Sequence, residues 1–209
     1  QMHDGQFQLA QSNLVANYEF QPSPRNTRLL YICMVRMKQA KEAYQFLETH
    51  LQQHPKDISS LMSLAEMQIP QSYDLAIETY KKALAVYDKN GVAHNNIAFL
   101  YLQQQRLDLA RVHAEKALDI DATNSDVLDT LGQILLLQNE PKKALDYLSA
   151  AVNGSNAKNI SDEVYINYLK ALIANEQYSL AKNKIDSRQL PAKIAQELTA
   201  LLPIEENEG

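Results

Sequence analysis

Small and apolar residues recur at helical spacing along this chain, with polar residues between them. The most regular column is formed by Ala10, Ala43, Ala76, Ala110, Ala144 and Ala181. Successive alanines lie 33, 33, 34, 34 and 37 residues apart. A period of this length, kept over the whole chain, indicates a repeat protein.

Neighbouring columns predict a helix around each alanine. Three residues before the alanines stand Phe7, Ala40, Tyr73, Leu107, Pro141 and Tyr178, and four residues after them stand Leu14, Leu47, Tyr80, Ala114, Leu148 and Ile185. Residues three and four apart share one face of a helix. A second amphipathic stretch precedes each of these helices, so each repeat is predicted to be a helix pair. Gly132 in one such stretch costs about 1 kcal/mol relative to alanine, which indicates that its partner helix leaves no room for a side chain.

Turn-forming residues divide the chain into repeats. Pro22 and Pro55 stand where second helices should end, and Gly5 is predicted to lie at a turn. The predicted N-caps of the helices that follow the turns are Asp57, Ser125 and Asp162. The predicted division of a single array is 1–22 (second helix of a truncated repeat), 24–57, 58–90, 91–124, 125–161 and 162–188 (repeats), 189–203 (capping helix) and 204–209 (polar tail).

Two segments resemble tetratricopeptide repeats. They are "HNNIAFLYLQQQRLDLARVHAEKAL" at 94–118 and "LDTLGQILLLQNEPKKALDYLSAAV" at 128–152. The likeness is strongest over 91–152 and weakest over 5–57. It implies an all-α fold, a right-handed α-α superhelix of stacked antiparallel helix pairs. The phrases "NNIAFLY", "AEKALDID" and "DTLGQILL" are also similar to the C-terminal repeats of bacterial TPR lipoproteins of the PEP-CTERM/exosortase export system.

The resemblance implies a peptide-binding groove lined by the first helix of each pair. The residues that it places there are Asn95, Asn96, Phe99, Gln103, Asp126, Asp129, Thr130, Gln133, Glu163, Asn167 and Lys170. Asn96 and Asn167 would form a partial asparagine ladder, because an amide can donate to and accept from a ligand's main chain. The alternative is that these side chains cap or hydrogen-bond neighbouring helices. The lining is mixed and mildly acidic with one aromatic side chain, which suits a neutral or basic segment carrying an apolar residue.

Charge and composition narrow the range of partners. The net charge of −5 and the absence of a long basic block predict no binding to nucleic acid. The apolar runs are shorter than the ~20 residues needed to span a bilayer, so no membrane insertion is expected. Cys33 is the only cysteine and excludes an internal disulfide. The compartment stays open between cytoplasm and envelope, and the export-system resemblance favours the periplasm or envelope.

The sequence contains no recognisable catalytic, metal-binding or cofactor-binding motif. His50 and His54 have a spacing that can bind a metal, but no third ligand is near in the sequence. His94 is expected in the core and His113 without a partner. The chain is therefore predicted to be a non-enzymatic scaffold that binds a peptide segment or partner protein. The alternative is a structural spacer or self-association element of a larger protein.

Overall fold

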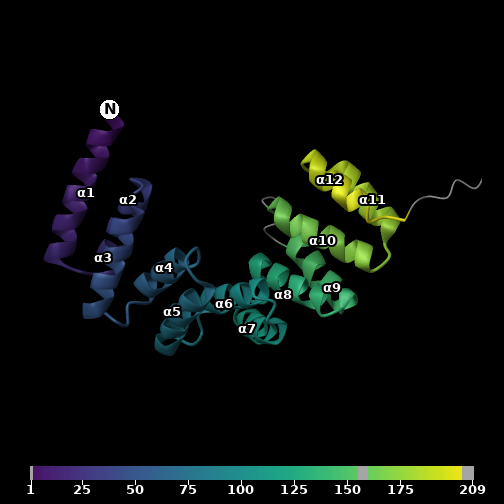
Figure 1. Ribbon diagram of the computed structural model, residues 1–209, viewed down its shortest axis with the longest axis horizontal. Coiled ribbons are helices and arrows are strands. Elements are labelled where there is room, and N and C mark those ends of the chain that lie inside the picture. The colour runs from purple at the N-terminus through teal and green to yellow at the C-terminus, as the bar shows by residue number, and fades with distance from the viewer. Residues whose placement is uncertain (1, 155–159, 204–209) are drawn as a thin grey trace, which may run out of the picture. The chain divides into compact units, whose positions relative to one another are not determined.

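The computed structural model describes residues 2–154 and 160–203, with side chains described from Leu9 onward. Within these residues the chain consists of twelve α-helices and contains no strand (Figure 1). The helices are α1 (Met2–Phe20), α2 (Pro24–Arg36), α3 (Ala40–Gln53), α4 (Ile58–Gln68), α5 (Tyr73–Val86), α6 (Gly91–Gln103), α7 (Leu107–Ile120), α8 (Ser125–Leu137), α9 (Pro141–Asn153), α10 (Asp162–Ala174), α11 (Tyr178–Ser187) and α12 (Ala192–Thr199). The all-α prediction is confirmed. The polar tail predicted at 204–209 lies outside the described residues.

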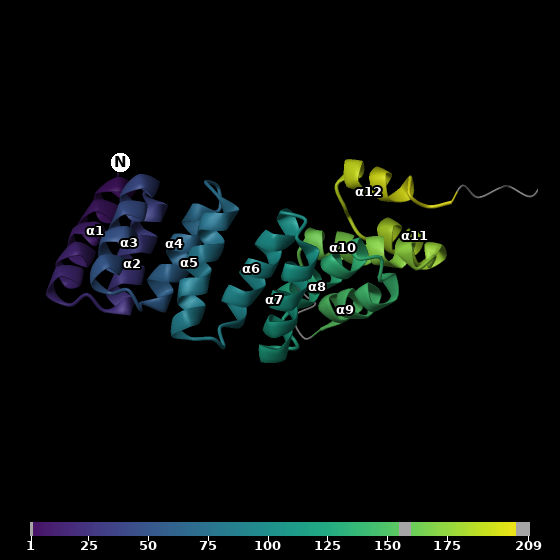
Figure 2. The same ribbon diagram turned by 60° about the horizontal axis from the view of Figure 1, so that its bottom comes forward.

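The helices belong to two compact units. Unit 1 is Gln1–Ala93 and unit 2 is His94–Gly209. In unit 1, α2 packs on α3 and α4 packs on α5; in unit 2, α8 packs on α9 and α10 packs on α11. The α8/α9 pair can be followed in both views (Figures 1 and 2). The assignment of residues 1–209 to a single array stays a prediction.

The predicted repeat register agrees with the helix starts. The helices α3, α5, α7, α9 and α11 begin at Ala40, Tyr73, Leu107, Pro141 and Tyr178, the residues three before the alanines. The alanines at positions 43, 76, 110, 144 and 181 are all 0% exposed. Gly132 also has the predicted role, since a Cβ added there would lie 2.4 Å from Cγ of Leu148 on α9. Small side chains therefore set how closely paired helices approach.

One expectation for the first predicted helix is wrong. The helix α1 begins at Met2, so Gly5 lies inside a helix and not at a turn. Ala10 is exposed, unlike the other alanines of its column.

One of the three predicted N-caps is confirmed. The Asp57 carboxylate caps α4 by accepting from two backbone N–H groups of its first turn. The predictions of Ser125 and Asp162 are one residue late, because Asn124 caps α8 and Ser161 caps α10. A side-chain oxygen reaches the unpaired N–H groups of the first turn only from the extended residue before the helix.

Four turns inside the helix pairs use the same left-handed residue. Lys38, Gln105, Asn139 and Glu176 have φ between 59° and 61°. At each turn the next residue's N–H bonds to the carbonyl five positions earlier, as Arg106 N–H does to Tyr101 O at 2.9 Å. This is a Schellman ending, which normally favours glycine at the left-handed position. The guanidinium of Arg106 also lies 4.7 Å from the centroid of the Tyr101 ring, which adds a side-chain contact across the turn.

Replacing Gln105 by glycine is expected to raise the free energy of unfolding by roughly 0.5–1 kcal/mol. The left-handed backbone conformation is strained for glutamine but not for glycine. The relief of this strain in the folded state outweighs the greater conformational entropy that glycine gives the unfolded chain. Urea unfolding followed by circular dichroism measures the change. The matched control is Gln104→Gly, where the residue has no positive φ and the substitution should destabilise. Equal effects at both positions would contradict the explanation.

Candidate functional site

The eleven predicted groove residues differ in how much solvent they meet. Those on the surface are Phe99, Gln103, Asp126, Glu163 and Lys170. The half-buried ones are Asn95, Asn96 and Gln133, and the buried ones are Asp129, Thr130 and Asn167. All eleven lie in unit 2, on α6, α8 and α10, so the structure keeps them on first helices. Their role as a peptide-binding groove stays a prediction.

A buried carboxylate joins the first helices α8 and α10, which pack on each other. Asn167 on α10 donates from Nδ2 to Asp129 Oδ1 at 2.9 Å, and Gln133 donates from Nε2 to Asp129 Oδ2 at 2.7 Å. Asp129 is 7% exposed and Asn167 is 6% exposed. Each carboxylate oxygen thus has an amide donor, which is the condition for holding a charge away from water.

Burial raises the pKa of the Asp129 carboxyl group above its ordinary value of 3.8. The hydrogen bonds from Asn167 and Gln133 lower this pKa, while the charges of Glu163 and Asp126 raise it again. Asp126 lies one turn before Asp129 on α8, and Glu163 lies one turn before Asn167 on α10, so both exposed acids are on the same helix faces as this hydrogen-bonded pair. The result is a local patch of three carboxyl groups on α8 and α10, which we call the acidic patch (Asp126, Asp129 and Glu163).

Asn167 of the proposed ladder, and Thr130 at the aligned position of α8, both have partners within the chain. The Thr130 hydroxyl donates to the carbonyl of Asp126 in its own helix at 2.8 Å. The Asn167 amide is engaged by Asp129. Both contacts are hydrogen bonds within the protein, as expected if these side chains stabilise the helices and do not bind a ligand. Asn95 on α6 has the same repeat position as Asp129, and its Oδ1 is buried without a hydrogen-bond partner.

Phe99 is the aromatic side chain of the predicted groove and is 37% exposed. It occupies on α6 the repeat position that Gln133 occupies on α8 and Lys170 on α10. The surface of these first helices therefore combines an apolar contact with exposed acids and one lysine. Such a combination can bind a peptide through charge, a hydrophobic side chain and amide hydrogen bonds.

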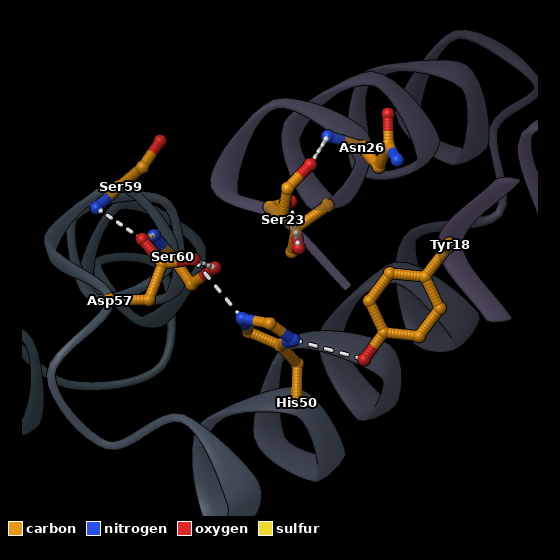
Figure 3. Close-up of polar contacts among 8 residues, drawn as sticks. Tyr18, Ser23, Asn26, His50, Asp57, Ser59 and Ser60 are labelled. Carbon is orange, nitrogen blue, oxygen red and sulfur yellow. Dashed lines mark hydrogen bonds and ion pairs between the residues drawn. The ribbon is translucent and has the colours of Figure 1, made fainter. Parts of the chain in front are cut away.

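His50 has a polar network that sequence reasoning missed (Figure 3). The hydroxyl oxygen of Tyr18 on α1 lies 2.9 Å from His50 Nδ1, and Asp57 Oδ2 lies 3.0 Å from His50 Nε2. Burial raises the pKa of Tyr18, which is opposite to what a nucleophilic tyrosine requires. The network links α1, the last turn of α3 and the N-cap of α4. The described part of the chain contains no cluster of three or more His, Cys, Asp or Glu side chains arranged to hold a metal ion.

A second histidine contact corrects another expectation. His94 is buried as predicted, but its Nδ1 lies 3.0 Å from Nδ1 of His113. The expectation that His113 lacks a partner is wrong. The two residues lie on consecutive helices, α6 and α7, and their separation of 19 positions in sequence carries no recognisable motif.

Among the residues that the structure describes, no helix has the length and apolar character needed to cross a membrane.

Comparisons with known proteins point to one family. Residues 90–157 match the model of the tetratricopeptide repeat. Comparison with curated proteins gave no significant match.

Three solved structures are similar in fold to this chain over most of the length of both chains. The structure of MamA protein is 15% identical with a TM-score of 0.63, covering 85% of this chain and 92% of that one. The structure of pilF from Pseudomonas aeruginosa is 19% identical with a TM-score of 0.69, covering 85% and 87%. YrrB, described as a TPR protein with an unusual peptide-binding site, is 13% identical with a TM-score of 0.68, covering 90% and 97%.

The recurring alanine period, the packed helix pairs and the family match over 90–157 all agree. Residues 90–157 therefore match the tetratricopeptide repeat within an all-α helical-repeat fold, and proteins with this repeat are generally non-catalytic scaffolds for protein interactions.

Proposed function

We propose that unit 2 binds a basic peptide segment along the first helices α6, α8 and α10. The observation that carries this proposal is the acidic patch. Asp129 is held there as a buried carboxylate, and Asp126 and Glu163 stand exposed beside it. Within the described residues no lysine or arginine forms an ion pair with these three acids. A ligand cation would supply the missing opposite charge.

The remaining residues of the face support recognition of a peptide over a small ion. Phe99 offers an exposed ring to an apolar side chain of the ligand. It stands one repeat before Gln133, at the equivalent position. Gln133 is half-buried and retains its carbonyl oxygen as an acceptor while its amide nitrogen holds Asp129. YrrB, a structural neighbour described as a TPR protein with an unusual peptide-binding site, gives additional support.

Charge reversal tests the proposal. Asp126→Lys combined with Glu163→Lys is expected to weaken binding of a lysine-rich peptide by about tenfold, because each exposed charge pair contributes up to about 1 kcal/mol. Fluorescence anisotropy with labelled peptides of equal length and basic, neutral or acidic composition measures the affinities. Wild-type protein should prefer the basic peptide, and this preference should weaken as salt is added.

The matched control reverses two exposed acids on second helices. Asp119 on α7 and Asp146 on α9 are both exposed, so Asp119→Lys with Asp146→Lys changes the net charge by the same amount. Affinity should stay near the wild-type value in this control. An equal loss in both variants would show that net charge alone acts, and an acidic peptide that binds as well as the basic one would refute the proposal.

We further propose that the scaffold serves a bacterial envelope or export assembly, on the strength of the resemblance to export-system lipoproteins. Cell fractionation tests the compartment, and exclusive recovery in the cytoplasm would contradict it. Light scattering across concentrations separates the scaffold from the self-association alternative. A mass that rises with concentration in the absence of peptide would favour self-association.

A further inference from the structure

His50 connects three helices of unit 1 through its imidazole ring. The ring belongs to the last turn of α3, is 1% exposed and lies between α1 and the start of α4 (Figure 3). Tyr18 reaches Nδ1 from α1, and Asp57, the N-cap of α4, reaches Nε2. Tyr18 also contacts α3 through the Phe46 ring, at 4.9 Å between centroids. One side chain therefore contributes both to the docking of α1 and to the cap of α4.

The partners of the ring determine where its proton lies. The Asp57 carboxylate already accepts from the backbone N–H of Ser59 at 3.1 Å and from the Ser60 hydroxyl at 2.9 Å. A carboxylate can only accept, so Nε2 of His50 carries the hydrogen and donates it to Asp57. In the neutral ring Nδ1 then accepts from the Tyr18 hydroxyl. A proton added at Nδ1 turns that nitrogen into a donor, so the Tyr18 hydroxyl must change from donor to acceptor, and a positive charge is placed on a ring that is 1% exposed.

The surroundings of His50 oppose a second proton overall. Burial lowers its pKa from the ordinary value of 6.5, Asp57 raises it, and the charge of His54 lowers it. The His54 ring stacks on His50 at 4.6 Å between centroids, from the same helix. From α1 the facing titratable group is Tyr18, from the start of α4 it is Asp57, and α2 contributes Pro24.

A cavity of about 310 Å³ gives solvent access to this network. It is lined by Pro22, Pro24, His50, His54, Pro55, Lys56 and Asp57. Lys56 adds a positive charge at the cavity wall. Water and protons can therefore approach the ring from this side without unfolding of the unit.

We propose that His50 is a proton-sensitive joint: acidification adds a proton to its ring and loosens the docking of α1 on α3. The proposal concerns unit 1 and is independent of peptide binding by unit 2. The folded state holds its proton more weakly than the unfolded state, so the unfolded state binds more protons between the lowered pKa and 6.5. Stability is complete above pH 6.5 and is lost as the pH falls through that window.

Hydrogen exchange of the full chain, resolved by helix and corrected for intrinsic rates, tests the proposal. Amide protection in α1 of the wild type should fall by up to about tenfold per pH unit below pH 6.5. His50→Gln should abolish this pH dependence, because a glutamine amide can donate to Asp57 and accept from Tyr18 but does not titrate. His54→Gln is the matched control and should retain the loss of protection in acid.

Two results would overturn the proposal. One is a wild-type α1 whose protection is independent of pH, and the other is a pH dependence that His50→Gln leaves unchanged. If His50→Gln does not fold, an NMR titration of the wild-type imidazole signals decides. The His50 signals should titrate below pH 6.5 together with shifts of the α1 amide signals. A ring that stays neutral until the whole chain unfolds would refute the proposal.

Discussion

Replacing Leu148 by alanine is expected to lower the free energy of unfolding by about 2–5 kcal/mol. The side chain is 0% exposed and lies on α9 against Gly132 of α8. Its removal leaves a cavity where α9 contacts Gly132 of α8, and the backbone of a helix pair can collapse only partly into it. Urea unfolding followed by circular dichroism measures the loss. The control Leu109→Ala removes the same atoms from an exposed position on α7 and should cost far less.

The same contact predicts an unusual response at Gly132. Alanine is the better helix former by about 1 kcal/mol, yet Gly132→Ala should destabilise by about 1–3 kcal/mol through overpacking. The reason is the added Cβ, which would lie 2.4 Å from Leu148 Cγ. In the Leu148→Ala background the same alanine should be neutral or stabilising. Strictly additive effects in this double-mutant cycle would show that the two positions do not compete for space.

Replacing Asn167 by alanine is the second change expected to have a large effect, with a loss of about 1–3 kcal/mol at neutral pH. Asp129 would remain buried with Gln133 as its amide donor. The lost hydrogen bond stabilises the ionised form of the Asp129 carboxyl group more than the neutral form. The pKa of Asp129 should therefore rise further. Urea unfolding at several pH values measures the difference from the wild type.

The sign of the pH dependence follows from the raised pKa of Asp129. A group with a raised folded-state pKa has its full contribution to stability below the unfolded value of 3.8, and loses it as the pH rises through the folded value. Asn167→Ala should therefore differ least from the wild type in acid and most above the pKa of Asp129. Asn183→Ala, at an exposed asparagine of α11, is the control and should show neither effect. A deficit independent of pH would contradict a charged Asp129.

Parts of the candidate site were within reach of sequence reasoning. Alignment of repeats placed Asp129, Thr130 and Asn167 on first helices, because helical periodicity alone sets which residues share a face. It did not show that Asn167 donates to Asp129, a contact between residues 38 positions apart. The choice between ligand ladder and structural hydrogen bond depends on distances between neighbouring repeats, which a period in sequence does not specify.

Small residues recurring every 33 to 37 positions determined by themselves that this chain forms paired helices, and where α3, α5, α7, α9 and α11 begin. Gly132 and the buried alanines are local signals, since each removes the side-chain volume that would keep two helices apart. Tertiary structure alone decided the polar contacts, such as those that His50 forms with Tyr18 and Asp57. It also decided that Ala10 is exposed, because burial requires a neighbouring helix as well as a suitable residue. Hydrogen bonds depend on the orientation of single atoms, and only the packed helices establish that orientation.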